Sequence, residues 1–197
     1  MGQRSQIYVR YEGKLIIARY YQWNYGERMI SRARYGIEHM KEDLANGFTF
    51  CFGEERYINH YIRILDANFD MKDIVISSDI LKEYAEYQAD EPTLDFSQFC
   101  FMQQDNNDGM LLIDIKGKTI KYAFLDYEAN TNNIMNARQY MKWDDENWRN
   151  SKYIGAAGIR TCIDNIQAIT SMAILMTEQE VKDYLRTDDY YGQPVPF

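Results

Sequence analysis

The sequence predicts an α+β fold in a single domain over residues 1–186, followed by a loosely ordered C-terminal tail over residues 187–197. Stretches that alternate polar and apolar residues, the pattern of half-buried strands, occur near the start and again in the middle of the chain. Apolar residues at steps of three and four, the pattern of helices that bury one face, follow the first of these stretches. Helices and strands mixed in this way, with mostly antiparallel connections, predict the α+β class.

The N-terminal segment predicts a β-hairpin followed by a long helix. The two strands and the turn between them are Gln6–Arg10, Lys14–Tyr21 and Tyr11–Gly13. Asn24, followed three positions later by Glu27, is a capping-box pattern that predicts the start of the helix. Asn46 and Gly47 predict its end, because glycine readily adopts the left-handed conformation that closes many helices.

The middle of the chain predicts short elements and then a sheet. The short elements are a strand at Phe48–Phe52, a helix within Glu54–Asn68, a buried strand at Ile74–Ile76 and a helix from Ser78 or Asp79 to Tyr87. The sheet is a three-stranded antiparallel meander of Phe96–Gln103, Met110–Ile115 and Thr119–Asp126. Turn dipeptides at Asp108-Gly109 and Lys116-Gly117 separate its strands.

The last third of the chain predicts helices. They are a helix after Asn130–Asn133 that ends near Met141, a helix within Tyr153–Ile169 and a helix that ends near Arg186. A second capping-box pattern, Thr177 to Glu180, opens the last of them. Pro194 and Pro196 break regular structure in the tail.

The charge is unevenly distributed along the chain. The net charge of −8 combines a balance of +5 over residues 1–34 with a balance of −13 over the rest. Such asymmetry is typical of separate interaction surfaces, although the two portions can also neutralise each other within one fold. An acidic chain is not drawn to DNA as a whole, which leaves only local nucleic-acid contact through the basic N-terminal segment.

The apolar runs are too short to span a membrane, and the N-terminus lacks the apolar core of a secretory signal. Three cysteines, Cys51, Cys100 and Cys162, form no metal-binding or disulfide pattern, so we expect a reducing, cytoplasmic environment and no cofactor. The two histidines, His39 and His60, lie in different predicted helices. Whether these five residues meet in three dimensions is left open by the sequence.

One pattern suggests an enzyme. Asp114 and Lys116 lie on one face of a predicted strand, as in restriction-endonuclease-type nucleases, where carboxylates hold Mg²⁺ and the lysine orients the attacking water. The alternative interpretation is an ordinary hairpin turn that carries lysines. A Mg²⁺-dependent nuclease is therefore the second functional hypothesis.

Two groups of residues suggest binding surfaces. The first is aromatic and basic and consists of Trp23, Tyr25, Arg28 and Arg32; arginines beside aromatic rings bind phosphates or stack on bases. The second is acidic and consists of Asp144, Asp145 and Glu146; carboxylates along one face imitate a phosphate backbone. For each group the alternative is structural: a covered seam between hairpin and helix for the first, and a solvated acidic face for the second.

The opening Met-Gly-x-Arg, with Gly2 and Arg4, followed by a hairpin and then Trp23 and Tyr25, resembles a group of small phage and mobile-element proteins. The size, the acidity, the 17 tyrosines and the lack of catalytic motifs are similar to type II-A anti-CRISPR proteins, which inhibit Cas9. The resemblance implies a phage or mobile-element protein that acts in the cytoplasm of a bacterial host cell. It transfers no functional residue.

The leading hypothesis is a non-enzymatic anti-defence protein that binds a host CRISPR effector, such as Cas9 or its complex with guide RNA. Stoichiometric binding through acidic and tyrosine-rich surfaces would block a basic nucleic-acid channel. A nucleic-acid-binding module that uses Arg28 and Arg32 is a third hypothesis, and it predicts binding that weakens steeply with salt.

Overall fold

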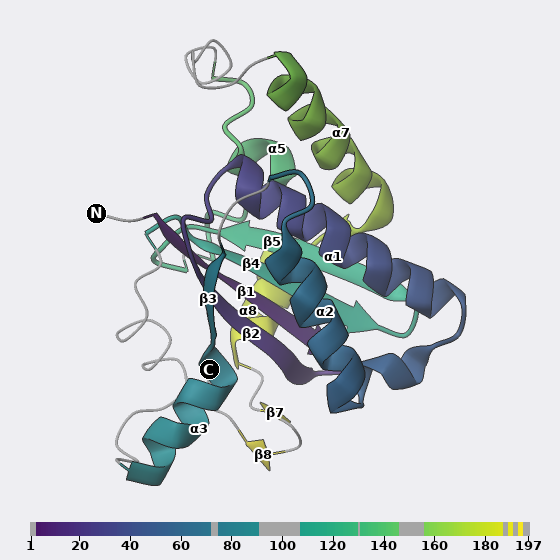
Figure 1. Cartoon of the computed structure of the whole chain (residues 1–197), viewed down its shortest axis with the longest axis vertical. Coiled ribbons are helices and arrows are strands. Elements are labelled where there is room, and N and C mark those ends of the chain that lie inside the picture. Colours follow the sequence, from purple (N-terminus) through teal and green to yellow (C-terminus); the bar gives the residue numbers. More distant parts are fainter. Residues whose placement is uncertain are drawn as a thin grey trace.

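The computed structural model describes residues 3–71, 75–90, 107–129, 131–145, 156–186, 189–190 and 193–194. In this part of the chain a mixed β-sheet carries helices on both of its faces (Figure 1). The prediction that helices and strands share one fold is confirmed.

The sheet is built on two hairpins. Strands β1 (Arg4–Tyr11) and β2 (Lys14–Gln22) pair antiparallel, with a bulge at Ile16 because Val9 pairs with Ile17 and Arg10 with Leu15. Strands β4 (Met110–Lys116) and β5 (Thr119–Leu125) form the second hairpin. The two hairpins join through β1 and β4, which run parallel.

The remaining strands are short. The sheet order is β6-β5-β4-β1-β2-β7-β8, with β3 also paired to β2. The short strands are β3 (Ile76–Asp79), β6 (Ile174–Leu175), β7 (Asp189–Tyr190) and β8 (Gln193–Pro194). The three-stranded meander is not confirmed: Phe96–Gln103 lies outside the described residues, and the neighbour of β4 opposite β5 is β1.

Two cores lie on opposite faces of the sheet. The larger one is formed with α1 (Glu27–Ala45), α2 (Glu55–Ala67), α5 (Ala137–Tyr140) and α7 (Ala156–Met172). The smaller one is formed with α3 (Ile80–Asp90) and α8 (Glu178–Arg186). Successive side chains of β1 point to opposite faces of the sheet, so Ile7 and Val9 lie in the larger core and Tyr8 in the smaller one.

Local capping signals are mostly confirmed. Helix α1 ends as predicted, with Gly47 left-handed and the Phe48 backbone N–H donating to the Asp43 carbonyl, a Schellman motif. Asp79 caps α3 by accepting from the Leu81 N–H, and Thr177 and Glu180 form the predicted capping box of α8. These signals depend only on neighbouring residues, which is why the sequence carries them.

Three local predictions are wrong. Residues Thr49–Phe52 form a 3₁₀ helix and not a strand. Of the buried strand predicted at Ile74–Ile76, Ile74 lies outside the described residues, and β3 begins only at Ile76, which is 47% exposed because β3 lies at the border of the sheet. Asn24 does not cap α1: Gly26 holds that position, and the Asn24 side chain is buried in contact with Ser5 and Arg32.

Among the described residues, no helix combines the length and the apolar character needed to cross a membrane.

Candidate functional site

One end of the sheet carries a cleft of about 490 Å³, here called the end cleft. The starts of β1 and β4 form one side of it. They are tied together there, since the Asp108 N–H donates to the Arg4 carbonyl and the Gln6 N–H to the Gly109 carbonyl. A volume of this size is typical of sites that hold a small ligand or a protruding side chain.

A loop after β5 builds the second side of the end cleft. The chain leaves the sheet at Asp126 and returns at Met135, which pairs with Phe124 through two backbone hydrogen bonds. Within the loop the Asp126 carboxylate accepts from the Glu128 N–H at 3.2 Å and from the Asn133 amide at 3.1 Å. These contacts fix the carboxylate on the cleft wall, beside the 58% exposed ring of Tyr127.

The start of α1 and the end of α5 form the third side. Tyr25 and Gly26 line the cleft there together with Tyr140, Met141 and Lys142. The Tyr140 hydroxyl donates to the Asp108 carbonyl at 3.0 Å, and burial raises the pKa of this phenol. The phenol is thus neutral, and its hydrogen bond to Asp108 links the end of α5 to the segment that precedes β4.

Backbone strain gathers around the end cleft. Lys142, which lines it, has a φ of 50°, and Trp23 and Ala129, each two residues from a lining tyrosine, have φ values of 58° and 51°. Residues other than glycine adopt this left-handed backbone conformation at a cost of about 1–3 kcal/mol each. Such costs are concentrated at functional sites, which makes this end of the molecule the first candidate.

The first predicted surface is divided by the fold. Trp23 is 52% exposed, Tyr25 lines the end cleft, and the Arg28 guanidinium lies 5.0 Å from the centre of the Tyr25 ring. Arg32 instead is buried: its guanidinium lies over Tyr21 and donates to Asn24 at 2.9 Å and to the Leu65 carbonyl. Arg32 therefore belongs to the core, and only the other three residues remain available for a surface.

The second predicted surface lies next to the same cleft. Asp144 and Asp145 are exposed and follow Lys142, which lines the cleft. Asp144 pairs with Arg138 at 2.5 Å. Glu146 lies outside the described residues. Tyr25 of the first group therefore lines the same cleft as Lys142, which lies two residues before the second group and more than a hundred positions away in the sequence.

Sequence reasoning missed Asp126, Tyr127 and Lys142 as cleft residues. Their only signal was their place in turns that follow β5 and α5, and turns of this kind occur throughout the chain.

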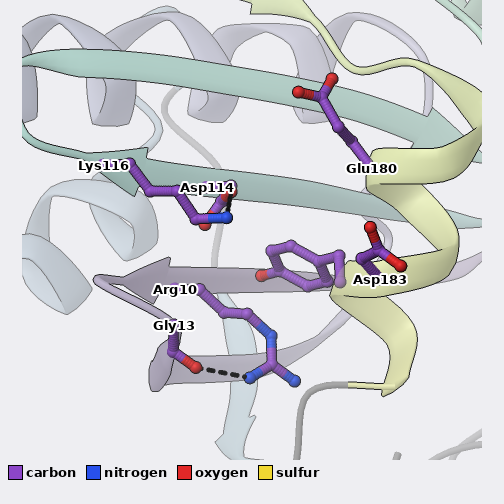
Figure 2. Close-up of a pocket in the computed structure, with 7 residues that line it drawn as sticks. Arg10, Gly13, Asp114, Lys116, Glu180 and Asp183 are labelled. Carbon is purple, nitrogen blue, oxygen red and sulfur yellow. Dashed lines mark hydrogen bonds and ion pairs between the residues drawn. The ribbon is translucent and has the colours of Figure 1, made fainter.

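Asp114 and Lys116, the residues of the nuclease hypothesis, lie elsewhere. They lie on β4 beside a small hollow of about 60 Å³. Figure 2 shows them there with Arg10 from β1 and two acidic residues from α8. The Lys116 amine lies 3.4 Å from the Asp114 carboxylate. The two acidic residues of α8 that line the hollow are Glu180, which pairs with Lys121, and Asp183.

This hollow is also where α8 is held against the sheet. The Tyr184 hydroxyl donates to the Ile113 carbonyl at 3.2 Å, and the Arg10 guanidinium lies 4.8 Å from the centre of the Tyr184 ring. Among the described residues, no group of three or more His, Cys, Asp or Glu side chains is arranged to hold a metal ion. Asp114 and Lys116 therefore lie beside the contacts that hold α8 on the sheet.

Asp114 gives the first testable prediction. Burial raises the pKa of its carboxyl above the ordinary value of 3.8, against the opposing effect of Lys116. The folded state then binds the proton more tightly than the unfolded state, so stability falls as pH rises from 3.8 through the folded pKa. Asp114→Asn is expected to be more stable than the wild type at pH 7 and equally stable at pH 3.

Urea unfolding at both pH values measures this difference. Asp164→Asn, an exposed position on α7, is the control and should change stability at neither pH. A loss of stability in Asp114→Asn at pH 7 would show that the pair with Lys116 outweighs the burial cost.

The cysteines and histidines do not form a site in the described residues. Cys51 and Cys162 are free and buried, and Cys100 lies outside the described residues. Burial raises the pKa of the Cys162 thiol to about 12, which keeps it protonated and unreactive at neutral pH. His39 bonds to the Tyr35 carbonyl, and His60 is exposed on α2.

Comparison with known proteins assigns no family. No family model matches the chain. The curated proteins and the solved structures likewise contain no match. The end cleft and its rim are thus the basis on which a function is proposed.

Proposed function

We propose that this chain is a phage or mobile-element anti-defence protein that binds a host CRISPR effector, such as Cas9, and blocks its nucleic-acid channel. The observation that carries the proposal is that Tyr25 of the aromatic segment and Lys142, which lies two residues before the acidic segment, line the same cleft at one end of the sheet. The resemblance of the opening segment to mobile-element proteins supplies the class of partner.

The chemistry of this end suits a basic partner. Exposed carboxylates of Glu128, Asp144 and Asp145 each lie within three residues of a residue that lines the end cleft. Carboxylates steer a positively charged protein surface into contact and compete there with phosphates. Trp23 and Tyr127 add exposed rings, and aromatic residues dominate the binding energy of many protein interfaces.

The proposal requires binding without turnover. A one-to-one inhibitor occupies the channel for as long as it stays bound, so its effect depends on the ratio of inhibitor to effector. It also has a salt dependence, since the contact between acidic and basic surfaces is screened at high ionic strength.

Mixing the protein with guide-loaded Cas9 tests the proposal. We expect co-elution in size-exclusion chromatography and a loss of DNA cleavage that is complete near equimolar ratio. The triple variant Trp23→Ala, Asp144→Lys, Asp145→Lys should weaken both effects at least about tenfold, because it removes an exposed ring and reverses two rim charges.

Glu42→Lys is the matched control for the charge reversal. Glu42 is exposed near the end of α1, fifteen residues after Glu27 and so about 22 Å along the helix from the end cleft. This variant should inhibit like the wild type. Unimpaired cleavage by Cas9 with no complex would remove the proposal.

A further inference from the structure

We propose that the end cleft is a receptor for a single arginine or lysine side chain presented by the partner. The inference takes the class of partner from the proposed function above, whereas the recognition of a cation rests on the residues of the cleft itself. Its lining residues supply three things that such a side chain needs: a carboxylate, aromatic faces and an apolar wall.

The carboxylate is that of Asp126. Its two oxygens accept from the Glu128 N–H and the Asn133 amide, so its plane is set before any ligand arrives. A fixed carboxylate suits a guanidinium, because the two groups match in planar, two-point hydrogen bonding. Pre-organisation of this kind lowers the entropic cost of binding.

The aromatic faces are those of Tyr25 and Tyr127. Cations are attracted to tyrosine faces at ring-centre distances up to about 6 Å. The protein already makes this contact at the cleft margin, since the Arg28 guanidinium lies 5.0 Å from the centre of the Tyr25 ring. Arg28 thus occupies one face of Tyr25, and the 58% exposed ring of Tyr127 is the aromatic surface open to a cation that enters from outside.

The apolar wall is the half-buried side chain of Met135, backed by the buried side chains of Leu125 and Met141. The stem of a lysine or arginine is hydrophobic and packs against such surfaces while its charged end reaches polar groups. Methionine side chains are flexible and adapt to irregular shapes. The wall thus suits either cationic side chain.

The charge of the lining favours a cation over a phosphate. Asp108 and Asp126 are the acidic lining residues and Lys142 the basic one. Lys142 is exposed, and the neighbouring Glu128 adds a further carboxylate beside Tyr127. Arg28 adds a cation beside Tyr25, and the Glu27 carboxylate lies 3.7 Å from its guanidinium. A phosphate group would meet an excess of negative charge, whereas a guanidinium or ammonium group meets its complement.

Methionine-methyl NMR provides the test on the intact chain. N-acetyl-argininamide is titrated into protein labelled at the methionine methyl groups, at low salt. We expect saturable shifts of Met135 and Met141 with a Kd of about 1–10 mM, a range typical of a single polar contact site. Met29 and Met40, which do not line the end cleft, should not shift.

N-acetyl-citrullinamide is the neutral control, with nearly the same shape and no charge. It should bind at least about tenfold more weakly, and so should argininamide to the variant Asp126→Asn. Glu42→Gln, an exposed position on α1 that does not line the cleft, should bind argininamide like the wild type. Far-UV circular dichroism and the unshifted core methionines confirm that each variant is folded.

The inference is overturned if Met135 and Met141 do not shift, or if citrullinamide binds as well as argininamide. Failure of the inference and failure of the proposed function are distinguishable. Argininamide binding without any Cas9 complex would refute the choice of partner and keep the receptor. Inhibition of Cas9 by Asp126→Asn at wild-type strength would keep the partner and refute the receptor's role in the complex.

Discussion

Gly109→Ala is expected to destabilise the fold by about 3 kcal/mol or more, because the new methyl group has no room. A Cβ at this position would lie 2.2 Å from the carbonyl oxygen of Leu125 and 3.2 Å from its carbon. These are backbone atoms of the neighbouring strand, which cannot turn aside as a side chain does. The backbone φ of 83° adds a second cost, since it lies in the left-handed region.

Gly117→Ala separates the two costs. Gly117 also has a positive φ, 57°, but a Cβ there would meet nothing within 4 Å. This variant should lose only the left-handed cost of about 1 kcal/mol. Urea unfolding of both variants measures the difference, and equal losses would show that the contact with Leu125 carries no energy.

Arg32→Met is expected to cost about 3 kcal/mol or more, although it places an apolar residue in an apolar core. The guanidinium donates to the Asn24 side chain and the Leu65 carbonyl and lies 4.5 Å from the centre of the Tyr21 ring. Methionine supplies no donor, so two buried acceptors lose their partner at about 1–3 kcal/mol each. The lost ring contact adds to this.

Arg34→Met is the control on the same helix. Arg34 is partly exposed and pairs with Glu38 four residues later, an interaction typically worth about 0.3–0.5 kcal/mol. Urea unfolding should show a loss of stability that is several-fold larger in Arg32→Met than in Arg34→Met. If Arg32→Met unfolds at the wild-type midpoint, the core does not depend on that guanidinium.

The local part of the fold could be predicted from the sequence. Residues that are neighbours in the sequence determine the first hairpin, the end of α1 at Gly47 and the capping box at Thr177. Each is stabilised by backbone and side-chain hydrogen bonds within a few positions. Such signals act in the same way in almost any tertiary context.

The non-local part could not be predicted. The parallel pairing of β1 with β4 joins Gln6 to Met110, and no residue pattern along either strand identifies its partner. The burial of Arg32 has the same origin, because its acceptors come from the chain before α1 and from α2. An arginine at that helical position is ordinarily a surface residue.

The candidate site was found only in part for the same reason. Tyr25 was identified because aromatic residues gather around it in the sequence. Asp126 and Lys142 are identified as site residues only because they line the cleft, which is formed by segments from both halves of the chain. A site made from turns of separate segments has no spacing that a single sequence can reveal.

The parallel pair of β1 and β4 also decides when the chain can fold. Until Met110–Lys116 has been synthesised, the edge of β1 that β4 later covers has no strand beside it, although the first hairpin can already close. An uncovered strand edge pairs readily with other chains. The nascent protein thus passes more than half of its synthesis with an open edge. Closing that edge requires residues about a hundred positions apart in the sequence to pair, which is slow.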